Sequence, residues 1–141
     1  MKKKAAKASK RALQRMLDGE RFVRTWGFRV HALGPGSCTL RLPFHRSLER
    51  PGGIVNGPAL MAAADCAMWL AIKAGLGIDR DALTSELNTT FLSPAIRETV
   101  YCTAKILKSG RRRIYGVAEC HSRSGKLYSH HTVTYVPIES D

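Results

Sequence analysis

The most constraining feature of the chain is an apolar segment, Gly57 to Ile72, that holds a single charged residue, Asp65. Because apolar side chains occupy nearly every face, the segment is predicted to be a helix in the protein core. Burying an unpaired carboxylate there would cost on the order of several kcal/mol. Asp65 also shares one stripe of the helix with Met61 and Met68, so full exposure is not expected. We therefore expect Asp65 to lie at a cavity or at a seam between protein chains, and we take it as the first functional candidate.

The length of 141 residues suits one domain with a substantial core and is too short for two. The four cysteines are scattered without metal-ligand spacing, and the five histidines form no convincing set. We therefore expect reduced thiols, no metal and no cofactor, in a cytoplasmic protein. The basic N-terminus is followed by an amphipathic stretch and does not resemble a signal peptide. The apolar segment is too short and alanine-rich to be predicted as a membrane span.

The net charge of +12 is concentrated in two places. Seven of the first fifteen residues are basic: Lys2, Lys3, Lys4, Lys7, Lys10, Arg11 and Arg15. This block is either a solvated arm or a contact for phosphate or nucleic acid. The second cluster is Arg111, Arg112 and Arg113, beside the predicted core. It is either an ordinary basic hairpin tip or a site for an anionic ligand such as a nucleotide phosphate.

Hydrophobic spacing predicts an α+β protein in which an antiparallel sheet packs on one central helix. An N-terminal helix is expected within residues 8–24, and the central helix is expected to open at Gly57 and to be ended by Gly75 and Gly77. Strands are predicted at 28–32, 38–42, 82–92, 99–107, 114–121 and 127–136, and a loop at 43–56. The basic arm and peripheral helix would occupy residues 1–26, and the main domain residues 27–138.

Three segments give the chain a resemblance to the hotdog-fold thioesterases of the PaaI-like group, the group named for phenylacetic acid degradation. Residues 52–58 (GGIVNGP) followed by Asp65 are similar to the family's G-x-x-H-G-G and its later acidic residue. Residues 84–95 (TSELNTTFLSPA) look like the family strand, and residues 131–135 (HTVTY) match its final strand. The resemblance covers roughly residues 27–137. It implies a hotdog fold, with the sheet wrapped around the long helix, and acyl-CoA thioesterase activity.

The resemblance also implies site residues, with two departures from the family pattern. Gly57, Asp65 and Thr84 match position by position. Asn56 stands where the family has histidine, and Arg50 where it has asparagine; Pro58 replaces the second glycine. Asn56 would either donate to a carbonyl or only cap the helix. Arg50 would either donate to the same carbonyl with charge or bind a ligand phosphate.

Thioester cleavage needs an attacking group and a donor for the oxyanion, and two residues suit these tasks. Asp65 would act as nucleophile or as the base for a water. The Gly57 N–H, at a helix N-terminus, would stabilise the oxyanion, and Thr84 would order the water unless it is only a strand residue. Eight residues of helix separate Gly57 from Asp65 by about 12 Å. One carbonyl cannot reach both, so the two groups are expected to come from different protomers of a homodimer.

The leading function is therefore hydrolysis of an acyl-CoA or aryl-CoA thioester, with the CoA phosphates meeting Arg111 to Arg113. A tetramer is implied by resemblance only. The alternative from another class is a non-catalytic acyl-CoA-binding regulator whose basic arm contacts DNA. The acyl group is not specified, although small side chains at Ala62, Ala63 and Ala67 suggest room for an aryl or branched chain.

Overall fold

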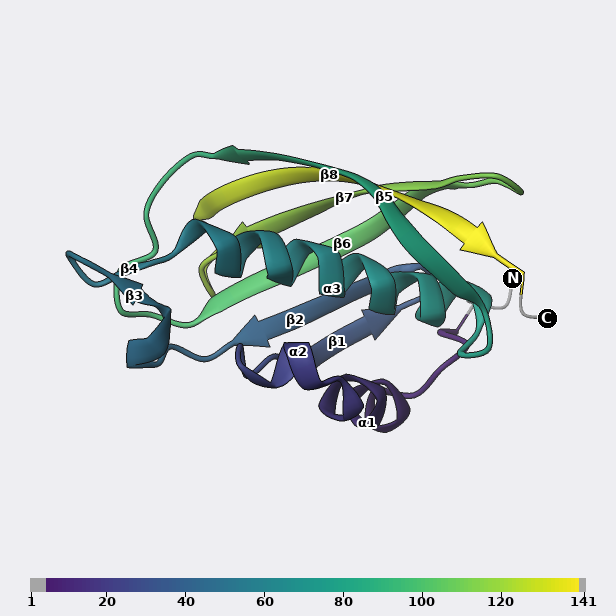
Figure 1. Cartoon of the computed structure of the whole chain (residues 1–141), viewed down its shortest axis with the longest axis horizontal. Coiled ribbons are helices and arrows are strands. Elements are labelled where there is room, and N and C mark those ends of the chain that lie inside the picture. The colour runs from purple at the N-terminus through teal and green to yellow at the C-terminus, as the bar shows by residue number, and fades with distance from the viewer. Residues whose placement is uncertain (1–4, 140–141) are drawn as a thin grey trace.

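A computed structural model of the chain describes residues 5–139, so Lys2, Lys3 and Lys4 of the predicted basic arm lie outside the described residues. The long helix α3 (Gly57–Leu76) lies across one face of a six-stranded antiparallel sheet (Figure 1). The sheet has the strand order β1-β2-β6-β7-β8-β5. This is the hotdog arrangement that the sequence predicted.

The sheet strands lie close to their predicted positions. They are β1 (Arg29–Gly34), β2 (Ser37–Leu42), β5 (Asp81–Phe91), β6 (Val100–Ser109), β7 (Ile114–His121) and β8 (Leu127–Ile138). β5 pairs with β8 alone and therefore forms one edge of the sheet, and β1 forms the other. These two edge strands pass on opposite sides of α3 (Figure 1), because the sheet curls around the helix.

The N-terminal helix was predicted as one element, but the structure breaks it in two. α1 (Lys10–Gly19) is capped by Ser9, whose side chain accepts the Ala12 N–H at 3.1 Å. It ends at Glu20, which has extended backbone angles, and the short α2 (Arg21–Arg24) follows. Leu13 and Leu17 of α1 are buried in the same core as the sheet, so this helix is part of the packed structure.

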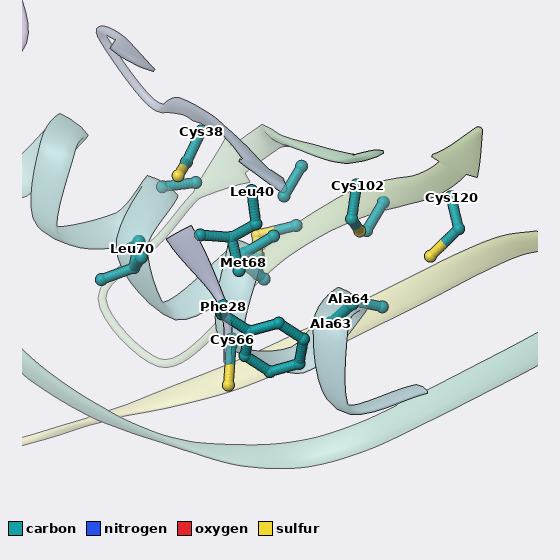
Figure 2. Close-up of a cluster of buried hydrophobic side chains, with 14 of the residues drawn as sticks. Phe28, Cys38, Leu40, Ala63, Ala64, Cys66, Met68, Leu70, Cys102 and Cys120 are labelled. Atoms are coloured by element: carbon teal, nitrogen blue, oxygen red, sulfur yellow. The ribbon is translucent and has the colours of Figure 1, made fainter. Parts of the chain in front are cut away.

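α3 forms the centre of the core, as its composition predicted. Ala63, Ala64, Met68 and Leu70 lie among Phe28, Leu40, Cys102 and Cys120 in the cluster shown in Figure 2. The helix is long and apolar enough to suit a membrane span by composition, yet 67% of that apolar window is buried inside the fold. Burial against the sheet therefore accounts for its hydrophobicity.

The predicted helix end at Gly75 was wrong, since α3 continues to Leu76 and its C-cap is Gly77 at φ +112°. Gly75 lies inside the helix, and a Cβ at this position would stand only 3.0 Å from the Gly36 backbone. Close packing, and not helix termination, explains this glycine. The predicted loop at 43–56 also contains structure: a 3-10 turn, η1 (Arg46–Leu48), and the short hairpin β3 (Glu49–Arg50) and β4 (Ile54–Val55).

Candidate active site

Asp65 is half-buried on α3, and two hydroxyl groups hold its carboxylate. Thr84 Oγ1 donates to Asp65 Oδ1 at 2.7 Å, and Tyr135 Oη donates to the same oxygen at 2.7 Å. Tyr135 also donates to the Asp65 backbone carbonyl at 2.9 Å. Within residues 5–139 no hydrogen bond reaches Oδ2. The carboxylate is thus anchored through one oxygen, and the other is left for a water or a substrate.

The sheet register explains why these two hydroxyls meet. Thr84 and Tyr135 are paired residues of β5 and β8, and β5 shifts register immediately after Thr84. Tyr135 alternates inward between the outward-facing Thr134 and Val136. Burial, followed by the nearby Asp65 carboxylate, raises the pKa of Tyr135 well above its ordinary value, so the phenol remains a donor. Sequence reasoning found Thr84 but missed Tyr135, although its inward position on the final strand was a usable signal.

A hollow of about 230 Å³ opens beside Asp65. Phe22, Trp69 and Leu83 supply its apolar walls, and Glu20 and Asp81 contribute two further carboxylates. The predicted room at Ala62, Ala63 and Ala67 is not part of this hollow: Ala63 and Ala67 are fully buried in the core, and none of the three lines it. Its space comes from the gap that α2 and the start of β5 leave over α3.

Cys66 also lines the hollow, next to Asp65 in the chain. Burial raises the pKa of its thiol to about 12, and the Asp65 and Glu20 carboxylates add to the rise. A thiol that stays protonated near neutral pH is a poor nucleophile. Asp65 is therefore the better candidate for the attacking or proton-accepting group.

Gly57 lies in a different hollow of about 400 Å³, together with Arg50, Leu60 and Phe91. Its backbone N–H has no hydrogen-bond acceptor in the described part of the chain. The Phe91 ring covers the position of the missing side chain, since a Cβ on Gly57 would stand 3.0 Å from that ring. The first turn of α3 therefore offers a free donor beside an apolar wall, as an oxyanion site requires.

Asn56 caps α3, which is one of the two roles predicted for it. Its Oδ1 accepts the Ala59 N–H at 2.8 Å, and its Nδ2 donates to the Leu48 carbonyl at 2.9 Å. Both polar atoms of the Asn56 side-chain amide are thus hydrogen-bonded to the backbone. Pro58 is exposed in the first turn of α3. Arg50 lies on β3 and reaches the Gly57 hollow.

The Asp65 hollow and the Gly57 hollow share no lining residue. The three arginines Arg111 to Arg113 lie in a third hollow of about 1330 Å³, with Tyr115 and Lys108. That hollow is lined by Thr134 and Val136, which face away from Tyr135, so it lies on the opposite face of β8 from Asp65. One copy of the chain therefore brings Thr84 to Asp65 and Arg50 to Gly57, but it does not bring all the predicted site residues together.

The histidines stand apart from these hollows. His131 is fully buried, with Thr89 Oγ1 at 2.8 Å from Nδ1 and Ser129 Oγ at 2.7 Å from Nε2. His130 pairs with Glu119 on the other face of β8. Among residues 5–139, no group of three His, Cys, Asp or Glu side chains is arranged to hold a metal ion. The polar chemistry of the site therefore rests on Asp65 and its two hydroxyl partners.

The fold is that of the hotdog class, and comparison with known proteins gives the family. The model of the thioesterase superfamily matches residues 52–129, so the chain belongs to that superfamily, whose common activity is thioester hydrolysis.

The chain is also similar to individual relatives and solved structures. A candidate esterase of Thermoplasma acidophilum, Ta0293, is 29% identical over 84% of this chain and 88% of its own. The conserved protein PA5202 of Pseudomonas aeruginosa is 28% identical with a TM-score of 0.81, over 88% of this chain and 98% of that one. The PaaI protein of the E. coli phenylacetic acid degradation operon shares the fold, with a TM-score of 0.80 at 16% identity over 89% of this chain and 90% of its own.

Proposed function

We propose that the protein hydrolyses acyl-CoA thioesters at sites formed between two copies of the chain. The observation that carries this proposal is the Asp65 carboxylate, held through Oδ1 beside an apolar hollow. In the general-base form, Asp65 takes a proton from water, and the oxygen attacks the thioester carbonyl. The oxyanion then accepts a hydrogen bond from a Gly57 N–H, and its collapse expels the CoA thiolate, which takes up the proton.

The same carboxylate could instead act as the nucleophile. An Asp65 oxygen would attack the carbonyl and expel the thiolate, leaving a mixed anhydride that water hydrolyses. Label in Asp65 after a single turnover in ¹⁸O-water identifies the nucleophilic form. The nucleophilic form puts label into Asp65 when water attacks the carboxyl carbon of the aspartyl anhydride, whereas the base form puts label only into the released acid.

Two copies are required because the donor and the carboxylate are too far apart on one. Gly57 and Asp65 are separated by about 12 Å of helix, and their hollows share no residue. A thioester carbonyl that lies within ~3 Å of the Gly57 N–H cannot also contact the Asp65 carboxylate about 12 Å along the helix. The site is completed if a partner supplies the missing half.

The edge strand β5 offers a route to that pairing. Among residues 5–139 no strand pairs with its outer side, and its Leu83 and Phe91 are 60% and 53% exposed. An unpaired edge with exposed apolar side chains favours association with another strand. Thr84, which binds Asp65, lies near the start of β5, and Phe91, which covers Gly57, lies at its end. Antiparallel pairing of two β5 strands would bring the Asp65 and Thr84 of one copy close to the Gly57 and Phe91 of the other.

The basic side chains would bind the CoA phosphates. Arg50 is next to Gly57 in its hollow, and Arg111 to Arg113 lie on the outer face of the sheet, near the strand that carries Thr84. Charge-assisted contacts from arginine suit phosphate oxygens. We expect their loss to raise KM for acyl-CoA and to leave turnover of an acyl-pantetheine, which lacks the nucleotide, almost unchanged.

Mixing two inactive variants tests the shared site. Asp65→Asn removes the carboxylate, and Gly57→Val drives a side chain against Phe91 and blocks the approach to the Gly57 N–H. In a mixed dimer one site carries both lesions and the other carries neither. After unfolding and refolding together, the mixture should recover about a quarter of wild-type activity, from one intact site in half of the dimers. No recovery, with both variants folded, would place donor and carboxylate in one protomer.

A further inference from the structure

The hollow beside Asp65 has a charge opposite to that of the molecule. The chain carries 23 basic and 11 acidic residues. Yet three carboxylates, those of Glu20, Asp65 and Asp81, line this one hollow, and no lysine or arginine in the described chain does. The mechanism uses Asp65 alone. The other two carboxylates therefore need a separate explanation.

The two unused carboxylates come from elements that close the hollow. Glu20 is half-buried at the junction of α1 and α2, where its backbone N–H donates to the Leu17 carbonyl. Glu20 lines the same hollow as Asp65 and Cys66, and its charge contributes to raising the pKa of the Cys66 thiol. Asp81 begins β5 on the other side, and its Oδ1 accepts the Ala82 N–H at 2.9 Å. The Asp81 side chain is thus held by a local hydrogen bond, whereas Glu20 is held within the described chain through its backbone N–H.

The remaining walls of the hollow are apolar. Phe22 on α2 is 66% exposed, and Trp69 and Leu83 lie on α3 and β5. A phenylalanine so exposed beside a lined hollow suits contact with an apolar ligand group. The hollow thus combines apolar walls with acidic residues from the α1–α2 junction and from the start of β5.

We propose that this hollow holds the acyl group and selects against acyl chains that carry a carboxylate, with Glu20 and Asp81 as the specificity-determining residues and Phe22 as an apolar contact. This inference rests on the proposed thioesterase function and adds the class of acyl group. A dicarboxylic acyl chain would bring its far carboxylate into a hollow lined by acidic side chains, where like charges repel. In a partly hydrated hollow such repulsion lowers kcat/KM about five- to tenfold for each carboxylate.

Hexanoyl-CoA and adipoyl-CoA are the matched substrates, because a terminal methyl group in one is a carboxylate in the other. The measured quantity is the ratio of their kcat/KM values. We expect Glu20→Gln and Asp81→Asn each to shift this ratio about five- to tenfold toward adipoyl-CoA. Adding salt should shift it the same way in the wild type, since salt screens exposed charges. Phe22→Ala should lower kcat/KM for hexanoyl-CoA more than for acetyl-CoA, which is too short to reach α2.

Glu98→Gln is the control, because it makes the same chemical change at an exposed position between β5 and β6, outside all three hollows. It should leave the ratio unchanged. A ratio that stays within twofold of wild type in both Glu20→Gln and Asp81→Asn, or that Glu98→Gln shifts equally, would overturn the inference. If the wild type hydrolyses neither substrate, the proposed function fails. Calorimetric dissociation constants of the two acyl-CoAs then decide this inference, and equal affinities would reject it.

Discussion

Replacing Tyr135 by phenylalanine tests whether Asp65 is held in its working position by the hydroxyl groups around it. The change removes a donor that lies 2.7 Å from Asp65 Oδ1 and leaves the ring in place. A hydrogen bond to a charged group contributes about 1.5–3 kcal/mol. Since Asp65 is half-buried and keeps its bond from Thr84, we expect a loss of about 1–2 kcal/mol, or roughly 5- to 30-fold in kcat/KM.

Thr84→Val is the companion change, because Thr84 donates to the same oxygen at the same distance. Each single variant keeps one of the two donors to this oxygen and the double variant keeps neither, so the double variant should lose more than the product of the two single losses. Steady-state kinetics on a hexanoyl-CoA substrate, with thermal unfolding to check the fold, supplies the four rates. A Tyr135→Phe enzyme within twofold of wild type, or strictly multiplicative losses, would refute the argument that Oδ1 is the anchored oxygen.

Three further changes probe the surrounding structure. Asn56→Ala should lower the free energy of unfolding by about 1–2 kcal/mol, because α3 loses its N-cap; urea unfolding with an unchanged stability would contradict this. Lys73→Met should cost about 2 kcal/mol in the same assay, since the buried ammonium donates to the Ile78 and Arg80 carbonyls between α3 and β5, and an unaffected midpoint would count against that role. The rate of Cys66 alkylation, followed by mass spectrometry, should still be rising steeply between about pH 9 and 11, because the pKa of its thiol is about 12 and only the thiolate reacts; a plateau near pH 9 would disprove the raised pKa.

The central helix and its lone carboxylate could be predicted from sequence because both depend on local pattern. Apolar side chains on nearly every face of residues 57–72 require burial. A single carboxylate among them requires a polar partner or a cavity. Thr84 was predicted from resemblance to a known family, and the structure places its hydroxyl on Asp65. The separation of Gly57 from Asp65 also followed from helix geometry alone.

Other parts of the site depend on tertiary placement, which spacing in the sequence does not encode. Tyr135 meets Asp65 only through the register of β8 against β5, and that register depends on a shift beside Thr84. Glu20 and Phe22 reach the hollow because a helix predicted as continuous breaks at Glu20. Arg111 to Arg113 lie in the turn between β6 and β7. Their position on the side of the sheet away from Asp65 likewise depends on the direction in which this hairpin projects.

The strand β5 touches both halves of the site, with Thr84 near one end and Phe91 at the other. The interval between these contacts is seven residues of extended chain, or about 23 Å. That interval is set by covalent length, which no loop motion can alter. A one-residue insertion or deletion between the two contacts would reverse the facing of one of them. Length changes in exposed turns should be tolerated far better, so natural variation in chain length is expected to avoid β5.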